Sequence, residues 1–165
     1  LPKSEHPSFR ISPEHMGTLR EVIALLEFRI SVETEAAALA AMRRRPENLQ
    51  ELRTALDAFN QAIEEDRDAV AADHQFHQEI ARATQNHHFI DLMHSLGAGV
   101  IPRARIGSIL TQDPERQNYL RRVNQEHESI FNAIAEQDVE AARAAMRTHL
   151  ANSRERLRKS DPDSL

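Results

Sequence analysis

The 165-residue sequence contains no cysteine and no tryptophan, only four glycines and only 4% aromatic residues. The absence of cysteine excludes disulfides, thiolate metal ligands and thiol nucleophiles, and it is compatible with a reducing cytoplasm. Four glycines are too few for a turn-rich β fold. Ala, Leu, Glu and Arg are abundant instead, and these residues favour helices over sheets. The composition therefore predicts an all-α protein.

Long hydrophobic runs and an excess of positive charge are also missing. The longest apolar run, Ala36–Met42, is far too short to span a membrane, and no signal peptide is visible. The formal net charge of −5 argues against a broad surface for nucleic acid. Hydrophobic residues make up 40% of the chain, which is enough for one domain with a real core. We therefore expect one cytoplasmic domain with no membrane partner.

Prolines and polar residues mark the two ends of the predicted helical domain. Residues 1–12 contain two prolines and no periodic pattern, so they are predicted to be an interdomain linker or extended arm. Ser12-Pro13 is typical of a helix start, with serine as the N-cap and proline at the first helical position. Residues 160–165 are polar and are predicted to be a frayed tail. The helical domain should therefore span residues 13–159.

Apolar residues recur at three- and four-residue spacing along most of this domain, which is the pattern of amphipathic helices. Short connections between the periodic segments indicate a compact, mostly antiparallel bundle. The predicted helices span residues 13–44, 46–64, 66–85, 88–110, 113–137 and 138–159.

Four polar side chains interrupt the apolar faces of three predicted helices. Asp73 and His77 are four residues apart, so both should lie on the inward face of the third helix. His127 and His149 lie near the middle of the inward stripes of the last two helices. Burying such groups without partners costs several kcal/mol, so something must satisfy them. One aspartate and three histidines inside a bundle are typical of a metal site.

The ligand types narrow the choice of metal without deciding it. Three imidazoles and a carboxylate suit Zn²⁺, Ni²⁺, Co²⁺, Fe²⁺ or Mn²⁺. A di-iron carboxylate site needs Glu-x-x-His pairs, and no histidine here has a glutamate three residues before it. The His-Glu-x-x-His pattern and a glycine-rich phosphate loop are also absent. For any single histidine, an ordinary hydrogen-bonded core position is the alternative. We expect one divalent transition-metal ion per chain.

The arginines on inward faces bear on what such a metal does. A catalytic metal normally lies beside a general acid or base, and a structural one is closed by four ligands. A sensing site keeps positions open for a ligand and adds cations for its carboxylate. Arg29 and Arg103 lie on inward faces, which favours sensing. The alternatives are an ion pair of Arg29 with Glu33 four residues later, and a surface position for Arg103.

Two asparagines lie close to the candidate ligands in sequence. Asn124 is one turn before His127, and Asn152 is three residues after His149. Both are therefore predicted to contact hydroxyl groups of an effector, together with the two arginines.

Four segments in a fixed order carry a recognisable pattern. They are Phe28-Arg29-Ile30-Ser31-Val32-Glu33 followed by Ala36–Ala41, Asp73-x-x-Phe76-His77-x-x-Ile80-Ala81-x-Ala83-x-x-Asn86, His127-x-x-Ile130-x-x-Ala133-Ile134, and Asp138-x-x-Ala141-Ala142 followed by Met146-x-x-His149-Leu150. With these segments, the chain resembles the C-terminal effector-binding domain, the FCD domain, of FadR-subfamily GntR transcriptional regulators. The resemblance covers about residues 20–155.

The resemblance implies a bundle of six or seven helices. In the metal-binding branch of that family, the positions of Asp73, His77, His127 and His149 hold a divalent metal. Family effectors are typically small organic acids, so a hydroxy-, keto- or sugar acid is the expected ligand, and a homodimer is expected because the family usually dimerises. Family members also carry an N-terminal winged helix-turn-helix, which this sequence lacks. Operator DNA should therefore be bound only through that missing domain.

The predicted function is effector sensing for a bacterial transcription regulator, without enzymatic activity. The metal would organise the pocket, and a carboxylate ligand would complete its coordination. A small metalloenzyme acting on an organic acid is the alternative, and a purely structural metal is a third possibility.

Overall fold

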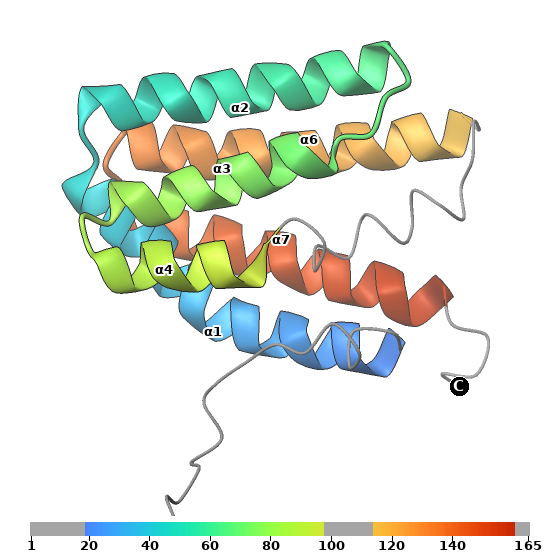
Figure 1. Ribbon diagram of the computed structural model, residues 1–165, viewed down its shortest axis with the longest axis horizontal. Coiled ribbons are helices and arrows are strands. Elements are labelled where there is room, and N and C mark those ends of the chain that lie inside the picture. Colours follow the sequence, from blue (N-terminus) through green and yellow to red (C-terminus); the bar gives the residue numbers. More distant parts are fainter. Residues whose placement is uncertain (1–18, 98–113, 161–165) are drawn as a thin grey trace, which may run out of the picture.

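The computed structural model describes residues 19–97 and 114–160. Within these ranges the chain forms six α-helices and no strand (Figure 1). The helices are α1 (Leu19–Arg43), α2 (Pro46–Glu64), α3 (Val70–Ala83), α4 (His87–Leu96), α6 (Pro114–Ala135) and α7 (Val139–Ser160). The all-α bundle predicted from the sequence is confirmed.

The third helix differs from its prediction at the N-terminal end. The sequence predicts a start at residue 66, whereas α3 begins at Val70. Asp66 has a φ of 53°, in the left-handed region, which interrupts helical geometry directly after α2. The Asp68 carboxylate then accepts a hydrogen bond from the backbone N–H of Val70 at 2.9 Å. Such local side-chain bonding competes with helix formation. The first residues of the predicted helix therefore belong to the connection between α2 and α3.

The segment predicted as the fourth helix, residues 88–110, is described only to Gly97, and the helix at this position is α4. It ends at Leu96, and Gly97 follows with a φ of 64°, which ends the helix at a position that glycine tolerates. The rest of the predicted segment to residue 110, including Arg103, lies outside the described residues. The predicted linker, residues 1–12, and residues 161–165 of the predicted tail also lie outside them.

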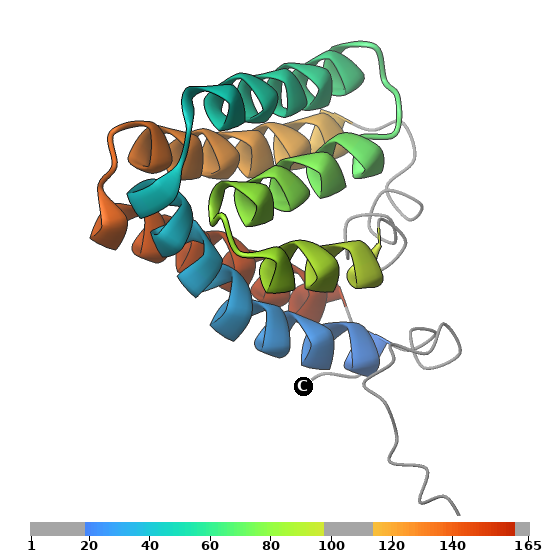
Figure 2. The ribbon, with the colours of Figure 1, turned by 60° about the vertical axis from the view of Figure 1, so that its left-hand side comes forward.

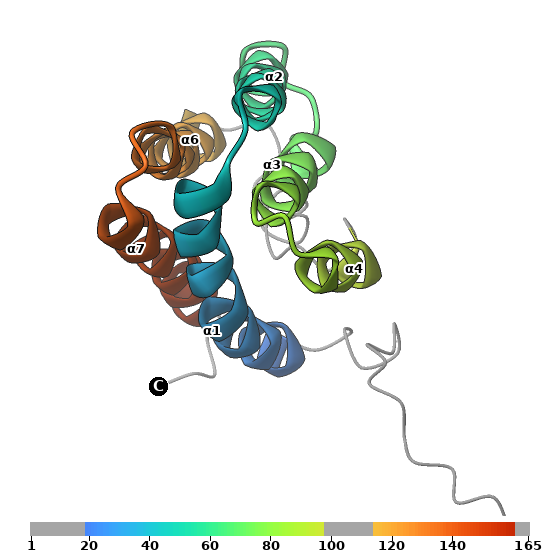
Figure 3. The same ribbon diagram turned by 90° about the vertical axis from the view of Figure 1, so that its left-hand side faces the viewer.

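Helix α1 packs mainly on three other helices, α3, α6 and α7 (Figure 3). Its alanine-rich second half is buried on more than one side, because Ala36, Ala37, Ala38, Ala40 and Ala41 are all buried. A helix that is apolar over most of its circumference belongs in a core. The buried surface of α1 is therefore wider than a single inward stripe.

The remaining helices are arranged around α1. Helix α4 packs on α3, α3 on α2, α2 on α6, and α6 on α7, and Figures 2 and 3 show this order as an arc. The three helices that carry the candidate ligands, α3, α6 and α7, all contact α1. The interior that they share with α1 is therefore where residues from all three helices can meet.

Two arginines at the end of α1 hold the ends of two neighbouring helices. Arg43 donates to the carbonyl of Thr84 at 3.1 Å, directly after α3, and Arg44 donates to the carbonyl of Ala135 at 2.7 Å, at the end of α6. A cation at the carboxyl end of a helix satisfies an orphan carbonyl and opposes the negative end of the helix dipole. α1 therefore helps to set the positions of α3 and α6.

Among the described helices, none combines the length and the apolar character that crossing a lipid bilayer requires.

Candidate metal centre

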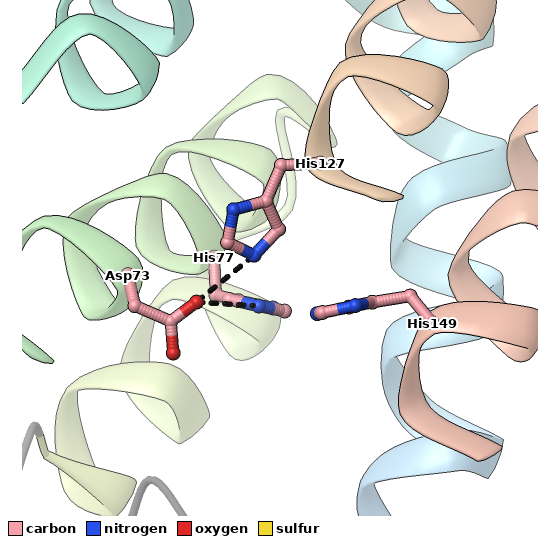
Figure 4. Close-up of side chains that lie close together, drawn as sticks. All are labelled: Asp73, His77, His127 and His149. Carbon is pink, nitrogen blue, oxygen red and sulfur yellow. Dashed lines mark ion pairs between the residues drawn. The ribbon is translucent and has the colours of Figure 1, made fainter. Parts of the chain in front are cut away.

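Asp73, His77, His127 and His149 converge in the interior of the bundle. Their relative exposure is 0%, 1%, 0% and 0%, and one potential ligand atom from each lies within 4.8 Å of the others. Figure 4 shows the carboxylate and the three imidazole rings pointing toward one another from α3, α6 and α7. The structure thus brings together all four residues that the sequence groups as candidate ligands.

The distances within this cluster suit one metal ion. Asp73 Oδ1 lies 2.9 Å from His127 Nε2 and 3.5 Å from His77 Nε2. The His149 ring stacks on the His77 ring at 5.4 Å and meets the His127 ring at 4.7 Å. Two ligands that are each about 2.1 Å from one ion lie at most about 4.2 Å apart. The candidate ligand atoms lie within 4.8 Å of one another, so any separation would have to close by no more than roughly half an ångström. The donor set therefore fits a divalent ion with only a small adjustment.

Local packing fixes the ring of His127. Phe59 on α2 meets it edge-on, with ring centroids 5.1 Å apart, and Phe76 on α3 lies 4.7 Å away. Both phenylalanines are fully buried. Close packing of rigid rings restricts the rotamers available to the imidazole. The apolar core thus holds this candidate ligand directly.

His77 is held instead by a buried carboxylate. Its Nδ1 lies 2.6 Å from Glu33 Oε1, and Glu33 Oε2 accepts a hydrogen bond from Arg29 Nε at 2.6 Å. Burial by itself would raise the pKa of Glu33, but the positive charge of Arg29 and the contact with His77 outweigh it and lower the pKa to about 2. Glu33 is therefore a carboxylate at neutral pH. The ion pair that the sequence leaves as an alternative for Arg29 is present.

The same neighbours act on His77. Burial lowers the pKa of this imidazole, but Glu33 and Asp73 favour its charged form and together raise the pKa above its ordinary value. A metal ion at this site therefore competes with a proton for the ring nitrogen.

His149 also has a carboxylate partner, which sequence reasoning does not identify. Its Nδ1 lies 2.8 Å from Oε1 of Glu126. Glu126 Oε2 in turn accepts hydrogen bonds from Asn152 Nδ2 at 2.8 Å and from Arg156 Nη2 at 2.7 Å. The only signal in the sequence is that His149, Asn152 and Arg156 share one face of a helix. Glu126 belongs to a different helix, so its contact depends on how α6 and α7 pack.

The predicted effector residues occupy different environments. Arg29 is buried, and its Nη2 makes no hydrogen bond with any described residue. Asn124 is half-buried, and its Oδ1 likewise has no hydrogen-bond partner among the described residues. Asn152 is exposed, and its amide is engaged with Glu126 at the Nδ1 side of the His149 ring, not within the cluster. Arg103 lies outside the described residues.

The FCD domain family matches residues 24–152 of this chain. Among curated relatives, the HTH-type transcriptional regulator LutR of Bacillus subtilis is 32% identical over 133 residues, which cover 80% of this chain and 60% of LutR. The Uxu operon regulator of Haemophilus influenzae is 26% identical over 136 residues, which cover 81% of this chain and 50% of that protein. The chain therefore spans only 50% to 60% of the length of these relatives.

Two solved structures share the fold. E. coli McbR/YncC has a TM-score of 0.70 and 18% identity, and the match covers 92% of this chain and 73% of that one. Streptococcus agalactiae GntR has a TM-score of 0.67 and 20% identity, and the match covers 84% of this chain and 60% of that one. Both curated relatives are named as regulators. This agrees with the prediction from the sequence that the chain is a regulatory domain rather than an enzyme.

Proposed function

The chain belongs to the FCD domain family, and we propose that it is the effector-sensing domain of a bacterial transcription regulator, with one divalent metal ion and a small organic acid as its ligands. The observation that carries the proposal is the convergence of Asp73, His77, His127 and His149 from three helices in the protein interior. Buried polar groups are retained in a core where they have partners, and this donor set suits a transition metal.

The charge of the ligand set supports an anionic effector. When the three histidines bind a metal they are neutral, so the four protein ligands bring one negative charge, that of Asp73, to an ion with two positive charges. In a poorly solvated interior, the remaining positive charge favours an anion as a further ligand. Ions such as Ni²⁺, Mn²⁺ and Fe²⁺ accept more than four ligands, and a hydroxy-, keto- or sugar acid offers a carboxylate oxygen with a second oxygen beside it.

Two buried polar atoms support contacts to such an acid. Arg29 Nη2 is a charged donor that makes no hydrogen bond with described residues, and it lies on the side chain that already holds Glu33 behind His77. Asn124 Oδ1 is a buried acceptor suited to an effector hydroxyl. Guanidinium groups match carboxylates well, so Arg29 is the proposed partner of the acid. Arg103 and Asn152 stay predicted contacts, and Asn152 would have to leave Glu126 to make one.

The proposal includes a longer whole protein. The curated relatives extend well beyond the matched part, and one of them is named as HTH-type. We propose that this chain is likewise joined, through residues 1–12, to a DNA-binding winged helix-turn-helix whose operator affinity the effector changes. The homodimer and the cytoplasmic location expected from the sequence stay predictions.

The proposal is tested by melting-temperature measurements with a library of small hydroxy-, keto- and sugar acids. Protein purified without chelator is compared with protein stripped of metal and with protein reloaded with Zn²⁺, Ni²⁺ or Mn²⁺. At least one acid should raise the melting temperature of the metal-containing protein and leave the stripped protein unchanged, because a ligand stabilises only the state that binds it.

Three outcomes would contradict it. If an acid raises the melting temperature of the stripped protein as much as that of the metal-containing protein, the metal is not part of the effector site. A bound metal without any response to acids indicates a structural ion. If chromatography shows that the protein converts a responsive acid into another compound, the metalloenzyme alternative is indicated, because a sensor returns its ligand unchanged.

A further inference from the structure

His77 and His149 each have a carboxylate directly behind the ring. Glu33 Oε1 lies 2.6 Å from His77 Nδ1, and Glu126 Oε1 lies 2.8 Å from His149 Nδ1. The two carboxylates come from different helices, α1 and α6. This repeated arrangement is the feature from which the inference starts.

Each carboxylate is itself anchored by an arginine, which lies one turn away on the same helix for Glu33 and on the neighbouring helix α7 for Glu126. Glu33 uses its second oxygen to accept a hydrogen bond from Arg29. Glu126 uses its second oxygen to accept hydrogen bonds from Arg156 and Asn152. Both glutamates therefore present one oxygen to a cation and the other to an imidazole. Because one oxygen is held by a cation, the position of the other oxygen against the histidine ring is also fixed.

The chemistry of these contacts decides which ring nitrogen carries the hydrogen. An ionised carboxylate can only accept a hydrogen bond, so the Nδ1 that it contacts must be the donor. In a neutral imidazole the other nitrogen, Nε2, then has the lone pair. His77 Nε2 faces Asp73 at 3.5 Å, and Figure 4 shows the tip of the His149 ring directed at the same cluster.

We infer that Glu33 and Glu126 are positioning residues that hold His77 and His149 as the tautomer with hydrogen on Nδ1, and that they thereby strengthen metal binding through Nε2. This inference rests on the metal site of the proposed function. An imidazole without such a partner populates both tautomers and more than one ring orientation, and only one combination presents the lone pair to the ion. Removing a carboxylate of this kind usually costs about 10- to 100-fold in metal affinity.

The chain offers a matched control for each glutamate, two residues away on the same helix. Glu128 on α6 pairs with Arg53 at 2.7 Å, and Glu35 on α1 pairs with Arg143 at 2.8 Å. Each control glutamate thus also has an arginine partner, but its ion pair does not involve a residue of the candidate metal cluster. Replacing it removes a similar ion pair without touching a candidate ligand.

The experiment measures two quantities in Glu126→Ala and in its control Glu128→Ala. The first is the affinity for Zn²⁺ alone, in competition with a colorimetric chelator. The second is the tautomer of His149, from the ¹⁵N chemical shifts of the histidine rings in metal-stripped protein. We expect Glu126→Ala to lose about 10- to 100-fold in Zn²⁺ affinity and to show mixed His149 tautomers, with Glu128→Ala unchanged in both. Glu126→Gln, which keeps the shape of the side chain, replaces Glu126→Ala if that variant does not fold.

Glu33 needs a charge-balanced variant because it is buried beside Arg29. The double variant Arg29→Met/Glu33→Gln removes both charges together, and Glu35→Gln is its control. The same loss of Zn²⁺ affinity is expected, now with mixed tautomers at His77.

The outcomes separate this inference from the proposed function. If Glu126→Ala binds Zn²⁺ as tightly as the parent, or keeps the single His149 tautomer, the positioning role is overturned while the metal site stands. If the parent chain binds neither Zn²⁺ nor Ni²⁺, Co²⁺, Fe²⁺ or Mn²⁺, the proposed metal site itself is overturned, and the inference falls with it.

Discussion

Arg29 and Glu33 form an ion pair inside the bundle. Arg29 Nε lies 2.6 Å from Glu33 Oε2, and the two side chains are only 2% and 3% exposed. The residues are one helical turn apart on α1, so the pair needs no other element to form. Its position directly behind His77 nevertheless connects the core of α1 to the candidate metal centre through α3.

Breaking this pair on one side should destabilise the protein strongly. Arg29→Met leaves the Glu33 carboxylate buried without its cation, and such a change costs about 3–5 kcal/mol. The double variant Arg29→Met/Glu33→Gln removes both charges and should recover at least half of that loss. Urea unfolding of metal-stripped protein measures both values. A double variant as unstable as Arg29→Met would show that the ion pair is not what stabilises this part of the core.

The candidate ligands should control metal content. His127→Ala and His149→Ala each remove one donor from the cluster, so the ion bound per chain should fall well below the near-stoichiometric value expected for the parent. His87 is exposed at the start of α4, so His87→Ala should leave metal content unchanged. The half-buried His74 precedes the cluster on α3, and His74→Ala should also leave it unchanged. Elemental analysis of protein purified without chelator gives the answer, and equal losses in the two groups would refute the ligand assignment.

Asn124 should contribute to effector binding but not to metal binding. Loss of its buried Oδ1 in Asn124→Ala should weaken the binding of a responsive acid by about 1 kcal/mol, the usual scale for one neutral hydrogen bond. Asn132→Ala, on the exposed side of the same helix, is the control for the change in helix propensity. Calorimetric titration measures the affinities. Identical affinities in the two variants would exclude Asn124 from the effector site.

Arg29 should contribute more to effector binding because its contact is charge-assisted. The comparison is made within the Glu33→Gln background, so that no buried carboxylate is left uncompensated. Adding Arg29→Met to Glu33→Gln should cost about 1.5–3 kcal/mol of acid binding, with metal content the same in both proteins. An unchanged acid affinity would mean that Arg29 serves only the ion pair.

The end of α1 should stabilise α6 through a single side chain. Arg44→Met removes the hydrogen bond to the carbonyl of Ala135 and should lower the free energy of unfolding by about 1–2 kcal/mol. The neighbouring Arg45 is exposed, so Arg45→Met should change stability by less than about 0.5 kcal/mol. Chemical denaturation distinguishes the two. If the two variants lose the same free energy of unfolding, Arg44 stabilises the protein through its charge alone and not through its contact with the end of α6.

The 165-residue chain alone should not bind operator DNA specifically. Its net charge is −5, and no predicted helix is a basic recognition helix. A gel-shift assay with candidate operator duplexes at physiological salt measures this. Specific binding at sub-micromolar concentration would place DNA recognition within this chain and overturn the assignment of that role to a missing domain.

Helical periodicity accounts for what the sequence determined. An α-helix places residues four apart on one face, so the spacing of Asp73 and His77 was enough to group them. The apolar residues at helical spacing around His127 and His149 were enough to predict that these two side chains face inward. All four candidate ligands are buried. The same reasoning explains the Arg29–Glu33 pair, because both partners lie on one helix. The all-α fold followed from the composition and from this periodicity along the chain.

Helix boundaries were less predictable where local side-chain bonding competes with the helix. The start of α3 at Val70 depends on the left-handed Asp66 and on the hydrogen bond that the Asp68 carboxylate accepts from the Val70 N–H, and neither has a periodic signal. Periodicity extends a helix until a strong breaker occurs, so the prediction began four residues too early.

Only the tertiary structure decided what lies behind each candidate ligand. Glu33 on α1 contacts His77 on α3, and Glu126 on α6 contacts His149 on α7. Each glutamate therefore lies on a different helix from the histidine that it contacts. Periodicity determines which face of a helix is inward, but contacts between helices also depend on their rotation, height and crossing angle. The sequence by itself therefore determined the candidate ligands, and the packing of α1, α3, α6 and α7 decided which carboxylates orient them.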